Sequence, residues 1–122
     1  MIMRVFWTKF ALDALHDIYD YYKDNVSVLI ANNIKESILL STHQLEVQPL
    51  SGTTETLLQH LNEGYRYIIR GNYKIIYKIQ SKRIYITDVF DTRQNPIKIY
   101  RNSESDVTLN EPIHTKYKKE IK

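Results

Sequence analysis

Hydrophobic and polar residues alternate from Tyr65 to Asp91, with interruptions at Gly71-Asn72 and at Ser81-Lys82. Side chains of a β-strand point to opposite faces in turn, so a period of two indicates strands with one apolar side. Two short interruptions between three such runs favour hairpin connections. The pattern therefore predicts a three-stranded antiparallel sheet in the second half of the chain.

The length of the turn at Gly71 and Asn72 determines which side chains of the first two strands lie on the same side of the sheet. The first strand separates Tyr65, Tyr67 and Ile69 from Arg66, Ile68 and Arg70, and the second separates Tyr73, Ile75, Tyr77 and Ile79 from Lys74, Ile76 and Lys78. A plain two-residue hairpin would pair Arg70 with Tyr73 and bring the arginines onto the apolar side of the second strand. Because that arrangement would bury charge, we predict one extra residue, a bulge, at Gly71.

The turn at Ser81 and Lys82 needs no extra residue. A two-residue loop there places Ile79 beside Ile84 and Tyr77 beside Ile86. Continued alternation then assigns Ile84, Ile86, Asp88 and Phe90 to the core side, and Tyr85, Thr87, Val89, Asp91 and Arg93 to the other side. We expect Asp88 to bond to backbone or to a tyrosine hydroxyl.

This register predicts one face that mixes cations with apolar side chains. Its residues are Arg66, Ile68, Arg70, Lys74, Ile76, Lys78, Tyr85 and Arg93. Lysines and arginines often cover a solvated sheet surface, but interleaved apolar residues favour a surface that a partner covers. We interpret this predicted basic face as a contact surface, with a solvated sheet face as the alternative.

The first half of the chain has the spacing of one strand and two helices. Residues 2–7 alternate as a short strand, and Thr8 is a suitable N-cap for an amphipathic helix over residues 9–23. Asn25 or Ser27 can cap a second helix that ends before Pro49. The helices should form an antiparallel hairpin and pack on a sheet face made of Tyr67, Ile69, Ile75, Tyr77, Ile84 and Ile86. We predict an α+β fold with an irregular connector over residues 50–64 that directs leucines onto the core.

Composition limits the class of protein. A chain of 122 residues suits one domain, which we place at residues 1–100, followed by a polar tail at 101–122 that is disordered or binds a partner. The absence of cysteine excludes disulfides, and residues 1–7 lack a signal-peptide pattern, so we expect a cytoplasmic protein. The four histidines have no ligand spacing and no run of about 20 apolar residues occurs, so we expect no metal, no cofactor and no membrane partner.

Two segments carry a resemblance to a known family. Gly71-Asn72-Tyr73-Lys74-Ile75-Ile76-Tyr77 and Val89-Phe90-Asp91-Thr92-Arg93-Gln94-Asn95-Pro96, following the order of strand, helical hairpin and strands, are similar to the RelE/ParE superfamily of bacterial toxins. The resemblance covers roughly Met3 to Pro96. It implies the toxin of a type II toxin-antitoxin or plasmid stabilisation system, held inactive by a cognate antitoxin. ParE-like members poison DNA gyrase, whereas RelE-like members cut mRNA on the ribosome.

The catalytic pattern of the RelE-like nucleases is only partly present. Arg66 and Arg93 match basic positions of that pattern, Lys74 stands where arginine is usual, and Ile68 replaces a basic residue. Tyr100 is a displaced counterpart of the tyrosine that follows Arg93 in those enzymes. RNA cleavage through the 2′-hydroxyl needs an acid and a base, which arginine does not supply at neutral pH.

The resemblance therefore leaves three alternatives. We favour a ParE-like toxin that inhibits growth by binding gyrase and that is not an enzyme. The second alternative is a RelE-like mRNA endoribonuclease with Arg66, Lys74, Arg93 and Tyr100 as candidate catalytic residues. The third is an inactive remnant that binds a partner. In each case an acidic, amphipathic antitoxin segment would dock on the predicted basic face.

Overall fold

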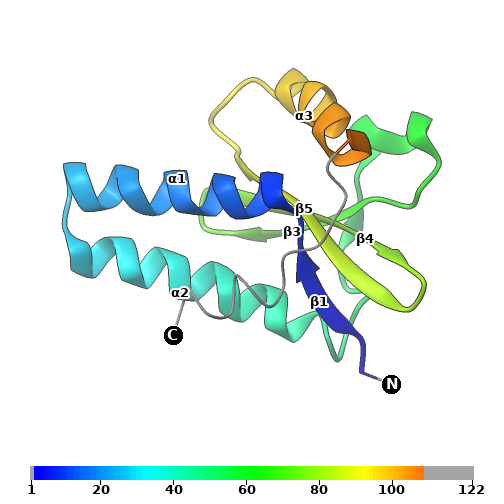
Figure 1. The fold of residues 1–122 in the computed structure, drawn as a ribbon, viewed down its shortest axis with the longest axis horizontal. Helices are drawn as coiled ribbons and strands as arrows, with labels where there is room; N and C mark the ends of the chain where they lie inside the picture. The colour runs from blue at the N-terminus through cyan, green and yellow to red at the C-terminus, as the bar shows by residue number, and fades with distance from the viewer. Residues whose placement is uncertain (1, 109–122) are drawn as a thin grey trace.

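The computed structural model describes residues 2–108 and has one mixed sheet with helices on both of its sides (Figure 1). The elements are β1 Arg4–Trp7, α1 Lys9–Asn25, α2 Val28–Gln44, β2 Thr53–Thr54, the 3₁₀ helix η1 Thr56–Leu61, β3 Arg66–Arg70, β4 Tyr73–Gln80, β5 Arg83–Asp91 and α3 Ile97–Thr108. The strand order is β1-β5-β4-β3-β2, and β1 runs parallel to β5. The α+β class is confirmed, and the predicted three-stranded sheet is the centre of a five-stranded mixed sheet.

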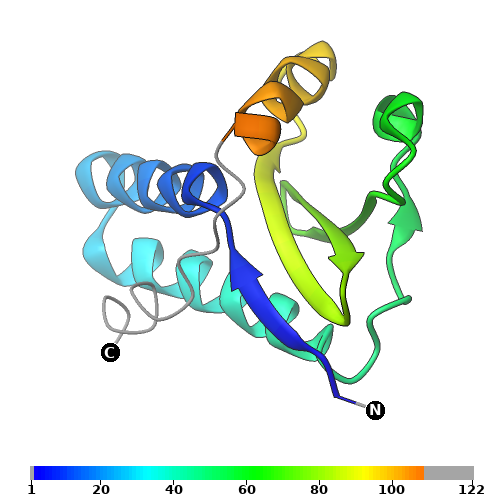
Figure 2. The ribbon, with the colours of Figure 1, turned by 45° about the vertical axis from the view of Figure 1, so that its right-hand side comes forward.

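The helical hairpin begins where its capping residues predict. Thr8 Oγ1 accepts a hydrogen bond from the N–H of Ala11, and Ser27 Oγ accepts one from the N–H of Ile30. These side chains satisfy N–H groups that the first helical turn leaves without a partner. α1 and α2 then lie together on one side of the sheet, as Figure 2 shows.

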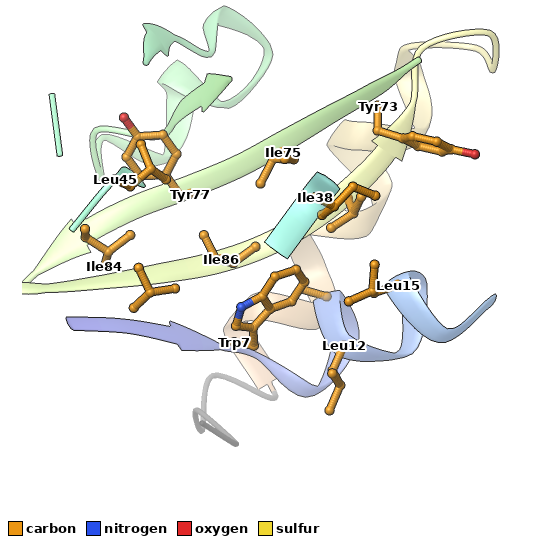
Figure 3. Packing of buried hydrophobic residues seen from close by; sticks show 13 residues of the cluster. Trp7, Leu12, Leu15, Ile38, Leu45, Tyr73, Ile75, Tyr77, Ile84 and Ile86 are labelled. Carbon is orange, nitrogen blue, oxygen red and sulfur yellow. The ribbon is translucent and has the colours of Figure 1, made fainter. Parts of the chain in front are cut away.

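The main hydrophobic core lies between this hairpin and the sheet (Figure 3). α1 contributes Leu12 and Leu15, α2 contributes Ile38, and Trp7 of β1 is also buried. The sheet contributes Tyr73, Ile75, Tyr77, Ile84, Ile86 and Val89. Tyr73 lies at the margin of the core, and its hydroxyl points away from the other labelled residues (Figure 3).

The predicted bulge at Gly71 is wrong. Arg70 pairs directly with Tyr73 across a regular two-residue turn, in which Gly71 has a φ of 58°. Glycine at the first central position is typical of a type II′ turn. The side of the sheet that α1 and α2 cover, called the helix side below, therefore carries Arg66, Ile68 and Arg70 together with their partners Tyr77, Ile75 and Tyr73.

The charge is nevertheless not buried in the core, because β3 lies next to the short edge strand β2. Arg70 is exposed, and its Nε donates to Ser37 Oγ of α2 at 2.6 Å. Arg66 reaches sideways and donates to the carbonyl of Gly52 at 2.8 Å. Long side chains at a sheet margin can thus share a face with core residues and still keep their charge at the surface.

The structure does contain a β-bulge, but the bulge lies within β5 and not at the Gly71 turn. The two-residue turn at Ser81 and Lys82 is confirmed, since Ile79 pairs with Ile84 and Tyr77 with Ile86. The register then shifts, because Ile76 pairs with Asp88 and leaves Thr87 as the bulged residue. Beyond this bulge the alternation is reversed, so Val89 enters the main core, while Asp88 and Phe90 lie on the opposite side, contrary to the predicted register.

A second hydrophobic cluster covers this opposite side of the sheet. It consists of Leu58, Tyr65, Ile76, Phe90 and Ile99, with Leu57, Leu61 and Tyr67 against it. The connector does direct its leucines onto the sheet, as predicted, through η1. Tyr67 belongs to this second cluster and Ile69 is 54% exposed, so the predicted helix-packing face is wrong for these two residues.

α3 was not predicted from the sequence. It spans the predicted boundary at residue 100 and buries Ile99 against the second cluster. Within residues 2–108 no helix is both long and apolar enough to cross a bilayer. The remainder of the predicted tail lies outside the described residues.

Candidate functional site

The structure divides the predicted basic face between the two sides of the sheet. Lys74, Ile76 and Lys78 share the side of the second cluster with Tyr85, which pairs with Lys78. Arg66, Ile68 and Arg70 lie on the helix side. Arg93 follows the reversed part of β5 and also lies on the helix side, next to Tyr22 of α1. The prediction that these residues form one face is wrong, and their role in binding stays a prediction.

The lysines of β4 are bound by the chain itself. Lys74 Nζ donates to Glu55 Oε1 at 2.8 Å and lies 4.2 Å from the centre of the Tyr67 ring. Lys78 Nζ donates to Glu63 Oε1 at 2.6 Å and lies over the ring of Tyr65. Glu55 and Lys78 are buried, so η1 and its flanking residues occupy the place where a partner was predicted.

Arg93 is held in a fixed position by a carboxylate. Its Nε and Nη2 donate to the two oxygens of Asp91 at 2.9 and 2.8 Å, which is the bidentate geometry of arginine and carboxylate. This contact keeps the pKa of Asp91 below its usual value. The guanidinium is therefore already paired before any ligand arrives.

Two tyrosines complete a polar group around Arg93. The hydroxyl of Tyr73 donates to the hydroxyl of Tyr22 at 3.3 Å, and Tyr22 also bonds to Arg93. These contacts lower the pKa of Tyr22, whereas burial and the bond to Tyr22 raise the pKa of Tyr73. The helical spacing of α1 places Tyr22 on its apolar stripe, and no local pattern in the sequence indicates the contact of Tyr22 with Arg93.

The candidate nuclease residues are not assembled into one centre. Lys74 lies on the side of the second cluster, whereas Arg66 and Arg93 lie on the helix side and are bound to Gly52 and Asp91. Tyr100 of α3 stacks on His60 of η1 with the ring centres 4.4 Å apart. Within the described residues no group of three or more His, Asp or Glu side chains could hold a metal ion.

The described residues line one groove between α2 and the β3–β4 turn and another where α1, the end of β5 and α3 meet. The first, which we call the α2-hairpin groove, has a volume of about 270 Å³ and lies between α2 and the β3–β4 turn. Its lining residues are Tyr22, Ile30, Asn33, Ile34, Ser37, Ile38, Arg70, Gly71, Asn72 and Tyr73. Leu29, at 69%, and Ile69, at 54%, add exposed apolar surface on α2 and β3. The α2-hairpin groove is apolar, and Arg70 is the cation in its lining.

The second, which we call the α1–α3 groove, has a volume of about 520 Å³ and is bounded by α1, the end of β5 and α3. Its lining residues are Phe10, Ala14, Asp17, Ile18, Tyr21, Tyr73, Asp88, Val89, Phe90, Asp91, Arg93, Gln94 and Asn102. Asp88 is 5% exposed and accepts a hydrogen bond from Asn102 Nδ2 at 3.0 Å. The expected backbone partner of Asp88 is present, since the N–H of Val89 donates to its carboxylate, and Asn102 of α3, a helix that was not predicted, adds an amide side chain.

Comparison with known proteins places these features in a family context. The family model described as the ParE toxin of the type II toxin-antitoxin system parDE matches residues 5–96. A search of curated proteins gave no match. A solved structure described as the chromosomal ParDE toxin-antitoxin system from P. aeruginosa has a similar fold, with a TM-score of 0.62 and 20% sequence identity. The alignment covers 74% of this chain and 96% of that chain.

Proposed function

Because this chain belongs to the ParE toxin family of type II toxin-antitoxin systems, we propose that it inhibits growth by binding DNA gyrase and that a cognate antitoxin neutralises it. Gyrase acts on chromosomal DNA, so this toxin would act in the cytoplasm.

The observation that carries the proposal is the separation of the candidate nuclease residues. Transition-state stabilisation requires charged groups that converge on one reacting phosphate. Here Arg66, Lys74 and Arg93 each bind an acceptor of the same chain, and Lys74 is on the other side of the sheet from the two arginines. This arrangement supports a toxin that acts by binding rather than by hydrolysis.

The α2-hairpin groove is the surface that best suits an antitoxin. It offers exposed Leu29 and Ile30 on α2, Ile69 on β3, and the guanidinium of Arg70 next to them. An amphipathic segment with an acidic residue could bury its apolar side there and pair with Arg70. This assignment moves the proposed antitoxin contact away from Lys74 and Lys78, which the chain itself covers.

The decisive experiment is induction of the protein in cells. A gyrase poison should cause DNA breaks and the SOS response while mRNA stays intact, and purified protein should stabilise cleaved DNA in the presence of gyrase. Arrest of translation with cleaved mRNA, and without DNA breaks, would reject the proposal.

One observation favours the ribonuclease alternative. The phenol of Tyr22, whose pKa is lowered by Tyr73 and Arg93, is a titratable group beside a cation. A base and a cation are two of the groups that RNA cleavage requires. Purified ribosomes with bound mRNA test this alternative, and we expect the mRNA to remain uncut.

A further inference from the structure

The α1–α3 groove is acidic and partly apolar, and the contacts of the described residues leave it open. Its lining contains three carboxylates, those of Asp17, Asp88 and Asp91, and one guanidinium, Arg93, which is bound to Asp91. The α1 wall also presents Phe10 and Ile18, so the groove suits an occupant with both cationic and apolar side chains.

Asp88 is a buried member of the groove lining. The groups that bond to its carboxylate are neutral, the Asn102 amide and the backbone N–H of Val89. Burial raises the pKa of Asp88 to about 6. A cation that entered the groove would stabilise the charged carboxylate and lower this pKa again.

We propose that the C-terminal segment of this same chain, residues 109–122, occupies the α1–α3 groove. Apolar residues recur in this segment at every fourth position, as Leu109, Ile113, Tyr117 and Ile121. The α1 wall of the groove presents apolar residues of its own, Phe10, Ala14 and Ile18, which the apolar residues of the segment can contact.

The charge of the segment complements the charge of the groove. Residues 109–122 contain Lys116, Lys118, Lys119 and Lys122, against Glu111 and Glu120. Lysine side chains combine a long apolar stem with a terminal cation, so they can cross apolar walls and reach a carboxylate such as Asp17. The pattern of the segment thus matches both the apolar and the acidic residues of the groove.

The segment is attached to the chain close to the groove. It follows Thr108 directly, and Asn102, six residues earlier on α3, lines the groove. Six residues of helix span about 9 Å, whereas fourteen residues reach at most about 45 Å when extended. In Figure 2 the C-terminal end of α3 is the end that lies nearer to the start of α1. Attachment to the same chain also gives an effective concentration in the millimolar range, which favours the segment over a separate molecule.

The test is paramagnetic relaxation enhancement on the full-length chain, made by cell-free synthesis to avoid toxicity. The protein contains no cysteine, so Thr115→Cys gives one attachment site for a nitroxide label. Docking in the groove should reduce the amide signals of residues 10–21 and 88–94 at least twofold. The amide signals of residues 28–40 on α2 should keep their intensity.

Two charge variants of the labelled chain serve as a matched pair. Lys116→Gln, Lys118→Gln and Lys119→Gln together should restore the groove signals, whereas Glu111→Gln with Glu120→Gln should leave them reduced. An even effect over the whole surface, or an effect centred outside the groove, would overturn the proposal. Reduced signals in a mixture of labelled chain and unlabelled isotope-enriched chain would identify a second copy as the occupant, which would overturn it equally.

Discussion

At the scale of single residues, Asp88 has the least favourable surroundings among the described carboxylates whose pKa is shifted. The charged form loses hydration on burial, and one amide and one backbone N–H return only part of that stabilisation. The folded-state pKa of about 6 therefore exceeds the ordinary value of 3.8. Asp17 on α1 and the Asp91–Arg93 pair at the end of β5 are the other charged groups that line the same groove.

This pKa predicts a loss of stability as the pH rises. A carboxyl group with a raised folded-state pKa contributes its full stability below pH 4 and loses it as the pH rises through about 6, at a total of about 3 kcal/mol. Asp88→Asn removes the titration and keeps an acceptor for Asn102. From pH 4.5 to pH 7.5 the free energy of unfolding of the variant should gain about 2 kcal/mol relative to the parent.

Urea titrations at the two pH values measure this gain. Both chains should carry Lys116→Gln, Lys118→Gln and Lys119→Gln, because a lysine in the groove would itself lower the pKa of Asp88. A difference between variant and parent that does not change with pH would show that Asp88 is not the titrating group.

Tyr100 and Tyr22 give a second prediction at this scale. Tyr100 stacks on His60 through its ring, so Tyr100→Phe keeps the contact and removes only the hydroxyl. Tyr22→Phe removes the phenol that bonds to Arg93. A toxin that acts by binding gyrase should stay toxic in both variants, with growth inhibition within about twofold of the parent.

Growth curves after induction, together with mapping of mRNA ends, provide the measurement. Loss of toxicity in Tyr22→Phe together with loss of codon-specific mRNA ends would support the ribonuclease alternative instead.

At the scale of elements, η1 is attached to the sheet by charged groups as well as by leucines. Glu55 accepts from Leu57 at the start of η1 and from Lys74 of β4. Glu63, two residues after η1, accepts from Lys78. Gly52, upstream, must remain glycine, since a Cβ would lie 2.5 Å from the Tyr77 hydroxyl and 2.8 Å from the carbonyl of Tyr67. The connector is therefore irregular in backbone but fixed by specific partners.

The two ion pairs of this connector should differ in their effect on stability. The side chains of Glu55 and Lys74 are 3% and 18% exposed, and removal of one member of such a buried pair leaves the other charge uncompensated. Glu55→Gln should lower the free energy of unfolding by about 3 kcal/mol. Glu63→Gln is the matched control and should cost less, about 1 kcal/mol, because the Glu63 side chain is 41% exposed and water can take its place beside Lys78, although the Lys78 side chain is itself only 10% exposed.

Chemical denaturation of both variants makes the comparison. Addition of Lys74→Met to Glu55→Gln should recover part of the loss, since the uncompensated cation is then removed. Equal losses for the two single variants would contradict the assignment of Glu55 as the buried anchor.

At the scale of the whole molecule, the two sides of the sheet have different roles. On the side with α3 and η1, Glu55 and Glu63 pair with Lys74 and Lys78, whereas the side with α1 and α2 carries the α2-hairpin groove and the exposed apolar residues of α2. The α1–α3 groove lies between the two sides, where α1, the end of β5 and α3 meet. A partner that needs apolar surface and a cation should therefore bind at the α2-hairpin groove.

The antitoxin prediction belongs to this scale. The product of a short neighbouring gene should co-purify with this protein and restore growth. Arg70→Glu places an anion at the α2-hairpin groove and should weaken binding of that antitoxin at least tenfold, by loss of a charge pair and by repulsion. Lys82→Glu makes the same change in charge at the exposed β4–β5 turn and should leave the affinity unchanged.

Titration calorimetry of the purified pair measures both affinities. Equal affinities for Arg70→Glu and the parent would exclude the α2-hairpin groove as the antitoxin site, and failure of any neighbouring product to bind would count against neutralisation by an antitoxin.

The sequence by itself determined the first strand, the two helices of the hairpin and the existence of the three central strands. Thr8 and Ser27 cap α1 and α2 as expected, and the turn at Ser81 and Lys82 has its expected register. These features depend on residues that are close along the chain, so local spacing contains the necessary information. The polar group around Arg93 joins α1, β4 and the end of β5, and no local pattern could indicate it.

Only the tertiary structure decided which side chains share a face. The regular turn at Gly71 is allowed because β3 lies near the sheet edge, where Arg66 and Arg70 reach polar atoms outside the core. The bulge at Thr87 reverses the faces of the last part of β5, and one such residue moves Asp88, Phe90 and Arg93 together. A strand of period two carries no signal for such a shift, because its pattern is compatible with either face until neighbouring elements cover one of them.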